Sequence, residues 1–356
     1  MSETIDWALA RTVASRISGT DPFAESYHAA SLESDFERLT AEAQQHVELE
    51  VGFGSLAGPA RAKVVDRSDW VAANIASYRR LLRPVLGALE ERMTGPVAIV
   101  SGKIAGAEMG ALLGWMSSRV LGQYDLLVLE DEDPEDQDLV YYVGPNILAL
   151  EKKHSFPPEQ FRMWVALHEV THRTQFTGVP WLRHYFLGLV EQLVGMADPD
   201  PGRFFVALGR IAEWVRTGEN PLEEGGLSAL FASEEQRAVM ERVGGLMSLL
   251  EGHGDVVMDR AAVHLVPQAD RFGKVLRARR KEMGVATKMV QRMIGLEAKL
   301  NQYERGERFI EVVEADGGPG LLNWAFEQPE NLPTMAEIDE PQQWLARIGP
   351  AAAAAG

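Results

Sequence analysis

The sequence contains no cysteine among its 356 residues. This absence excludes disulfide bonds, iron–sulfur clusters, thiolate metal sites and cysteine nucleophiles. Histidine is also scarce, with 8 residues in the chain. Any transition metal in this protein must therefore be held by histidine, aspartate and glutamate side chains, and a pattern that places two histidines close together carries information.

Basic side chains are few compared with acidic ones, 35 against 52, which gives a formal net charge of −17 at pH 7. Such a surface repels phosphate backbones and anionic lipids, so we expect neither nucleic acid nor a membrane surface as a partner. Long apolar runs are also missing, since no segment approaches the roughly 20 residues of a membrane-spanning helix. The first six residues carry acid where a secretory signal carries base. We therefore expect a cytoplasmic protein.

The remaining composition is that of an ordinary globular protein, with 46% hydrophobic and 24% charged residues. Apolar residues three and four apart predict helices over about residues 3–17, 32–51, 68–92, 104–121, 158–177, 181–197, 201–216, 233–264 and 270–310. Three short segments rich in β-branched residues or leucine predict strands at 96–101, 125–130 and 138–145. The sequence thus predicts a mainly α protein with a small β-sheet, forming one domain over residues 1–348. A low-complexity tail at 349–356 is expected to be disordered.

The most informative segment is His168-Glu169-Val-Thr-His172, on the helix predicted at about 158–177. Residues four apart share a helix face, so both imidazoles can reach one metal ion. Glu169 lies on the flank of that face, where it can take a proton from a metal-bound water without being a ligand. The pattern is typical of zinc-dependent proteases. It predicts His168 and His172 as metal ligands and Glu169 as the general base.

A catalytic zinc ion usually needs a third protein ligand. The metzincin pattern would require glycine at 175 and histidine at 178, but the sequence has Gln175 and Gly178. On the helix predicted at about 233–264, Glu251 and Asp255 are four apart and share a face. We therefore expect Glu251 to bind the metal and Asp255 to accept a hydrogen bond from a histidine ligand.

His253 is the rival third ligand. Two residues along a continuous helix turn through about 200°, so His253 points away from the face of Glu251 if the helix is unbroken. Gly252 and Gly254 leave that continuity open. We favour Glu251, because only that arrangement gives Asp255 a role.

The paired histidines followed by Glu251 and Asp255 resemble the gluzincin arrangement of zinc metallopeptidases. Over nearly its full length the chain also resembles an actinobacterial zincin-like family of hydrolases, which genomic association links with coenzyme F420 biosynthesis. The stretches that carry this second likeness are Gly106–Gly110, Arg119–Asp125, the metal helix and Leu296–Phe309. The resemblance implies a zincin-like metallopeptidase architecture.

The same resemblance implies a hydrolase with one zinc ion per chain that cleaves an amide bond, most simply in a peptide or protein substrate. Glu169 would act first as the base and then as the proton donor to the leaving group. Gluzincins tend to stabilise the tetrahedral intermediate with a downstream histidine or tyrosine. Tyr303 is the better candidate for that role and His264 the weaker one. By analogy, the strand at 138–143 would present its edge to an extended peptide.

Two other functions stay open at this point. A zincin scaffold can retain every metal-site residue and still bind a peptide or protein partner without cleaving it. Glu25-Ser-Tyr-His28 and Glu169-Val-Thr-His172 are both E-x-x-H, and two such motifs hold a pair of irons in ferritin-like bundles. The di-iron interpretation, however, leaves His168 without a role. The basic residues between Arg271 and Lys281 are most simply a solvated helix face.

Overall fold

A computed structural model of the chain describes residues 4–21, 23, 26–83, 86, 96–126, 138–195, 234–281, 296–318 and 320–355. Its helices are α1 (Trp7–Ser18), α2 (Tyr27–Val51), α3 (Arg67–Leu81), α5 (Pro96–Ser117), α6 (Gly144–His154), α7 (Pro158–Gly178), α8 (Leu182–Gly195), α11 (Glu234–Leu265), α12 (Ala269–Lys281), α14 (Leu296–Gly317), α15 (Met335–Asp339) and α16 (Pro341–Ala355). Two 3-10 helices, η2 (Leu321–Phe326) and η3 (Pro329–Asn331), precede α15. The strands are β1 (Arg61–Val65), β2 (Gly122–Tyr124) and β3 (Leu139–Val143). The predicted fold class, mainly α with a small sheet, is confirmed.

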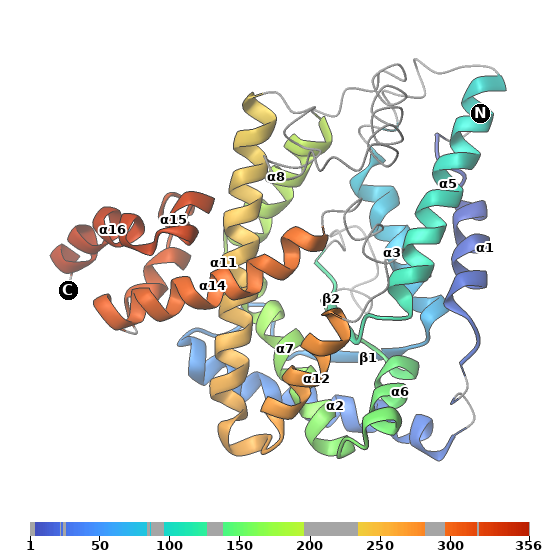
Figure 1. The fold of residues 1–356 in the computed structure, drawn as a ribbon, viewed down its shortest axis with the longest axis horizontal. Coiled ribbons are helices and arrows are strands. Elements are labelled where there is room, and N and C mark those ends of the chain that lie inside the picture. The colour runs from blue at the N-terminus through green and yellow to red at the C-terminus, as the bar shows by residue number, and fades with distance from the viewer. Residues whose placement is uncertain are drawn as a thin grey trace.

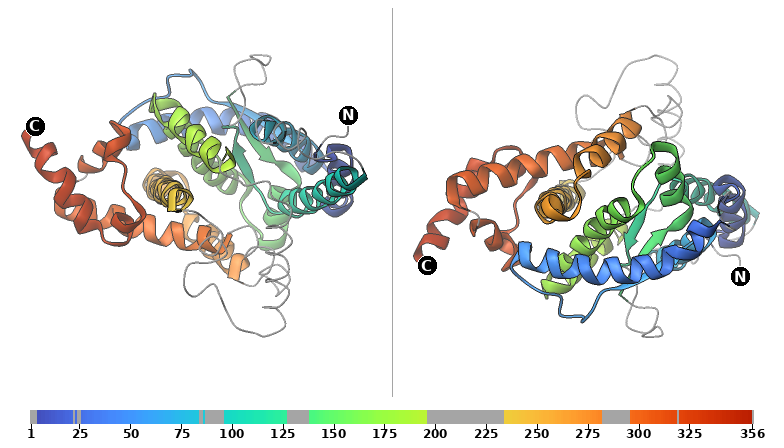
Figure 2. Two further views of the ribbon diagram at one scale, coloured as in Figure 1. Left: turned by 90° about the horizontal axis from the view of Figure 1, so that it is seen from above. Right: turned by 90° about the horizontal axis from the view of Figure 1, so that it is seen from below.

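The helices α1 and α5 pack together at one end of the molecule, and α15 and α16 lie at the opposite end (Figure 1 and Figure 2). Between the two ends, the long helix α11 packs against α7, and α14 crosses α11. Helix α7 also packs on α2 and on β2, so it contacts both the helical layer and the sheet. The metal motif predicted from the sequence is therefore at the centre of the fold.

The sheet has the order β1-β3-β2, with β1 parallel and β2 antiparallel to β3. All five residues of β3 are buried, as expected of a central strand covered on both faces. Side chains alternate along a strand: Val140 and Tyr142 pack into the hydrophobic cluster with α2 and α7, whereas Leu139, Tyr141 and Val143 pack with α1, α3 and α5. Helices on either side thus fix the sheet beside α7.

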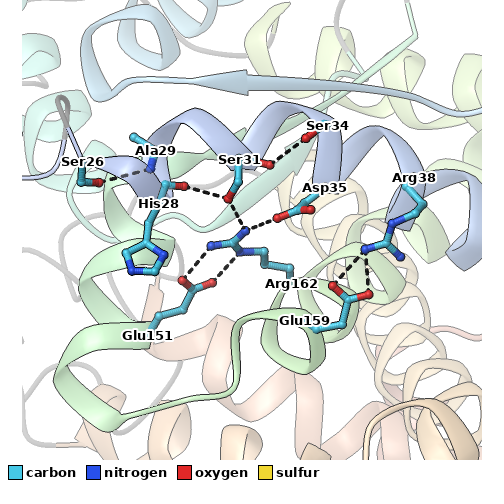
Figure 3. Close-up of polar contacts among 10 residues, drawn as sticks. All are labelled: Ser26, His28, Ala29, Ser31, Ser34, Asp35, Arg38, Glu151, Glu159 and Arg162. Carbon is cyan, nitrogen blue, oxygen red and sulfur yellow. Dashed lines mark hydrogen bonds and ion pairs between the residues drawn. The ribbon is translucent and has the colours of Figure 1, made fainter.

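A buried ion network holds the first turns of α7 against its neighbours (Figure 3). The guanidinium of Arg162 forms two parallel hydrogen bonds to Glu151 of α6, at 2.8 and 3.0 Å. Its third nitrogen contacts Asp35 and donates to Ser31 of α2 at 3.2 Å. Because bidentate Arg–carboxylate pairs are directional, Arg162 fixes α7 relative to both α2 and α6.

Helices α11 and α14 approach until their backbones touch. A Cβ atom added to Gly252 would lie 2.3 Å from the carbonyl carbon of Gly306, and one added to Gly306 would lie 2.0 Å from the backbone oxygen of Ser248. Only glycine permits this distance at the crossing. The crossing brings α14 against the segment of α11 that carries Glu251 and Asp255.

Several predicted elements differ from the structure. Residues 96–101, predicted as a strand, begin helix α5, because a short apolar run does not distinguish a buried strand from the first turns of an apolar helix. A strand is present at Gly122–Tyr124 rather than at 125–130, of which 127–130 lie outside the described residues. The predicted helix 201–216 also lies outside the described residues. Of the helix predicted at 270–310, the described parts are α12 and the beginning of α14, and residues 282–295 lie outside the described residues.

The prediction of a disordered tail at 349–356 is wrong for its described part, because α16 continues through Ala355. Trp344 and Ile348 bury this helix against the rest of the protein. The five alanines after Pro350 have the highest helix propensity and extend it. None of the helices that the structure describes is long and apolar enough to span a bilayer.

The buried ion network should contribute more to stability than a surface pair of the same residue types. Replacing Glu151 by alanine leaves the buried Arg162 with half of its charge compensation, so we expect Glu151→Ala to lower the free energy of unfolding by about 3 kcal/mol. The matched control is Glu159→Ala, which removes a surface ion pair with Arg38. The side chain of Arg38 is 50% exposed and that of Glu159 is 64% exposed. That control should cost under about 1 kcal/mol. Urea unfolding followed by circular dichroism measures both, and equal losses would contradict the role of the network.

Candidate metal centre

Helix α7 presents His168 and His172 on one face. Pro158 begins the helix, where a missing backbone N–H costs nothing, and the apolar side chains that follow, among them Phe161 and Leu167, pack into the core. The two imidazole rings lie edge to face with their centroids 4.8 Å apart. The spacing of four residues thus brings both rings to one place, as the sequence pattern predicted.

Helix α11 supplies the facing carboxylate. It is continuous from Glu234 to Leu265, so Gly252 and Gly254 do not interrupt it. Glu251 is buried, and its Oε2 lies 3.6 Å from Nε2 of His172. One donor atom each from His168, His172 and Glu251 lie within 4.8 Å of one another, a group of the kind that can share a metal ion.

Asp255, one turn further along α11, faces the other histidine. Its Oδ1 lies 3.8 Å from Nδ1 of His168, the ring nitrogen that a metal-bound histidine usually leaves for a hydrogen bond. The carboxyl group of Glu307 on α14 interacts with that of Asp255. Burial, followed by the charge of Asp259, raises the pKa of Glu307. Glu307 is a neighbour of the centre that sequence reasoning missed, since only the helix crossing brings it there.

The charges around His172 favour a cation. Burial acts to lower the pKa of His172, but the hydrogen bond and charge of Glu251, together with the charge of Glu169, outweigh it and raise the pKa to about 9. A site that holds a proton this firmly has an excess of negative charge. That excess, with two nitrogen donors and one oxygen donor, suits a zinc ion with a fourth position left open.

The donors are near enough to gather around one ion after small side-chain movements. Donors at about 2.1 Å from one tetrahedral zinc ion are about 3.4 Å apart, so the widest separation here, 4.8 Å, would contract by more than about 1 Å on binding. Gly254 of α11 leaves the space for the ring of His172: a Cβ atom there would lie 3.1 Å from Cε1. The residues present therefore fit a zinc ion.

His253, the rival ligand, has a different neighbour. Its Nδ1 is 3.0 Å from the amide nitrogen of Gln175, and its ring lies against Phe326. Burial, followed by the charges of His172 and Arg260, lowers the pKa of His253 to about 3, so this histidine is neutral. It is not in the group of candidate metal donors that the described residues form. The structure therefore favours Glu251 as the third donor.

Glu169 is buried beneath the edge of the sheet. A Cβ atom on Gly122 of β2 would lie 2.5 Å from Cγ and 2.9 Å from Oε1 of Glu169. The backbone of β2 thus lies directly on this side chain. Nothing in the sequence around Gly122 indicated the contact, because it exists only once β2 and α7 pack together.

Of the remaining candidates, His264 and His28 are described, and neither is in the candidate group of metal donors. The side chain of Tyr303 lies outside the described part of the chain, although its backbone belongs to α14. His264 is exposed in the last turn of α11. His28 is exposed at the beginning of α2 (Figure 3). Its ring lies against Tyr27, and Glu25 lies outside the described residues. Among described residues, His28 is not in a group that could hold a metal.

The prediction that the strand at 138–143 presents its edge to a peptide must be corrected. Leu139–Val143, within the predicted 138–143, pairs with β1 on one edge and with β2 on the other, so β3 has no free edge. In the part of the chain that the structure describes, β2 is an outer strand and is the one that packs on α7. The sequence could not give the order of the strands, since β1 was not predicted.

Two comparisons with known proteins find matches over nearly the whole chain. A family model for zincin-like metallopeptidases matches residues 5–345. Among solved structures, the chain is similar to the crystal structure of a candidate hydrolase with a novel fold from Chloroflexus aurantiacus, at 32% sequence identity and a TM-score of 0.72, over 97% of this chain and 99% of that one. No curated protein matches the chain.

The raised pKa of His172 predicts how metal and protons compete. In the metal-free protein we expect His172 to titrate near pH 9 instead of 6.5. A raised pKa stabilises the folded metal-free protein fully below about 6.5, and this stabilisation is lost as the pH rises through about 9. Since zinc must displace the proton, zinc affinity should rise with pH up to about 9.

Histidine resonances in NMR spectra measure this titration. Glu251→Gln removes the main group that raises the pKa of His172 and should lower that pKa. The prediction would be contradicted if His172 titrated at or below 6.5 in the unaltered protein.

Proposed function

We propose that this chain, which belongs to the zincin-like metallopeptidase family, is a zinc-dependent hydrolase that cleaves amide bonds, most simply peptide bonds. The observation that carries the proposal is the convergence of His168, His172 and Glu251 from two helices, with the buried carboxyl group of Glu169 beside them. The resemblance to a solved structure described as a candidate hydrolase supports the same class of reaction. The link with coenzyme F420 stays a prediction and has no part in this chemistry.

His168, His172 and Glu251 would hold one zinc ion per chain. When bound, the ion lowers the pKa of water toward about 7 and polarises the substrate carbonyl. Asp255 orients His168 through Nδ1, at the 3.8 Å distance described above. The other carboxylate next to the histidines, Glu169, is the one left for proton transfer.

Glu169 performs the proton transfers of hydrolysis. Its carboxylate takes a proton from the attacking water as the water oxygen bonds to the carbonyl carbon. The same group then gives that proton to the amine nitrogen as the C–N bond breaks, so base and acid are one side chain. Burial beneath Gly122 keeps the carboxylate in one position while the proton moves.

An extended peptide would bind along β2. Its backbone can pair with a strand that has a free edge, and the side chains then alternate between the sheet face and solvent. The strand β2 meets this need in the described part of the chain and passes directly over Glu169. A scissile bond held at β2 would therefore lie at the proton-transferring group.

Metal content and turnover test the proposal together. We expect the purified protein to contain about one zinc ion per chain by elemental mass spectrometry, and the double variant His168→Ala/His172→Ala to contain none. Glu169→Gln should keep the metal, because Glu169 is not a ligand, and should lower turnover of a mixed peptide library by about 10²- to 10⁴-fold.

Each other outcome has a definite meaning. Peptide cleavage that persists in a chelator would contradict zinc catalysis, and full turnover in Glu169→Gln would remove Glu169 from the mechanism. Zinc without cleavage of any peptide would favour a binding scaffold. Two irons per chain would move the protein to the di-iron class.

The contact between Gly122 and Glu169 predicts a variant with intact metal and impaired chemistry. In Gly122→Ala the new methyl group would overlap Cγ of Glu169 and displace its carboxylate. We expect kcat to fall by about tenfold or more with zinc content unchanged, since small misplacements of a reacting group are costly. Gly188→Ala on α8 is the control, because a Cβ atom there meets nothing within 4 Å. Equal activity of the two variants would contradict the positioning of Glu169 by β2.

A further inference from the structure

Gln175 connects the two helices of the metal centre. It lies one turn beyond His172 on α7, and its side chain is fully buried. Its amide oxygen Oε1 lies 3.0 Å from Nδ1 of His172. Its amide nitrogen Nε2 lies 3.0 Å from the Leu250 carbonyl oxygen and 3.0 Å from Nδ1 of His253. The sequence used Gln175 only to exclude a metzincin, and the proposed hydrolysis gives it no role.

The Leu250 carbonyl determines which way round the amide lies. A carbonyl oxygen only accepts hydrogen bonds, so the group of Gln175 that faces it must be the NH2 group. The amide oxygen then faces His172, whose Nδ1 must carry the proton that this oxygen accepts. The other ring nitrogen, Nε2, lies 3.6 Å from Glu251 and is the one available to a metal.

His253 completes the arrangement from α11. Its Nδ1 accepts the second hydrogen of the Gln175 amide. The imidazole itself is buried against Phe326. Turning the amide around would place its oxygen against the Leu250 carbonyl oxygen, and unsatisfied buried groups are costly. The amide therefore has one orientation, and the neutral ring of His172 has one tautomer.

We propose that Gln175 and His253 are positioning residues, which together hold His172 with its proton on Nδ1 and its Nε2 facing the metal. This inference rests on the proposed zinc site. The two histidine ligands would then be oriented by different groups. The carboxylate of Asp255 orients His168, and the neutral amide of Gln175 orients His172. A neutral partner suits His172, because Glu169 and Glu251 already place negative charge around that ring.

The test measures zinc affinity and the state of His172 in folded variants. Zinc alone is the probe, titrated against a chromophoric chelator. The ¹⁵N spectrum of the zinc-loaded, histidine-labelled protein reports whether Nδ1 carries a hydrogen-bonded proton. Gln175→Met keeps the volume of the side chain, and Gln175→Ala is a second variant in case one of them fails to fold.

We expect both Gln175 variants to bind zinc about 10- to 100-fold more weakly and to lose the hydrogen-bonded Nδ1–H signal of His172. His253→Phe, which removes the acceptor, should weaken binding by about fivefold. His253→Asn should bind zinc with nearly the affinity of the unaltered protein, because the asparagine oxygen can accept the hydrogen bond of Gln175 in place of Nδ1.

The matched control is Gln160→Ala. It removes an amide from the same helix whose oxygen accepts the backbone N–H of Gln268 at 3.2 Å, and it should leave zinc affinity and the His172 spectrum unchanged. Failure of the unaltered protein to bind zinc would overturn the proposed function and this inference together. Equal affinity and an unchanged Nδ1–H signal in the Gln175 variants would overturn this inference alone. If His253→Asn and His253→Phe weakened zinc binding equally, His253 would have no part in positioning His172.

Discussion

Two carboxyl groups, those of Glu169 and Glu251, are buried at the centre of the fold, and the arrangement of the site follows from their need for positive charge. Burying a carboxylate is costly unless a cation or hydrogen-bond donors replace the lost water. In the metal-free protein the proton held by His172 supplies part of that charge. A divalent ion on the same donors would supply more, so the histidines and carboxylates would form one electrostatic unit with it.

Charge compensation works only if the helices are held at a fixed distance. Helix α7 is held near its beginning by Arg162, which reaches both α2 and α6. Helix α11 is held by α14 through the contact at Gly252 and Gly306, which leaves no side chain to adjust. Between these two anchors, Gln175 joins α7 to α11 directly. The donors thus belong to a rigid frame, as preorganised sites require.

The local parts of this centre could be predicted from the sequence, and the parts that depend on packing could not. Two histidines four apart share a helix face in any fold, and the choice of Glu251 followed from the same spacing on a second helix. Periodicity does not say which helices touch, so the hydrogen bonds of Gln175 to α11 were invisible. Gly122 gave no signal for the same reason. The segment 96–101 was mistaken for a strand because its apolar run fits either element.

The two helices of the centre are distant in sequence, since Gln175 and Leu250, which hydrogen-bond across it, are 75 positions apart. Closing so long a loop costs conformational entropy before any contact compensates for it, so the ligand set exists only after α7 has docked on α11. A zinc finger gathers its metal while it folds, whereas the zinc ion proposed for this chain would find its full set of donors only after the helices have docked. Zinc supply would then determine how stable the native protein is, through mass action on the folded state, and not whether the chain reaches that state.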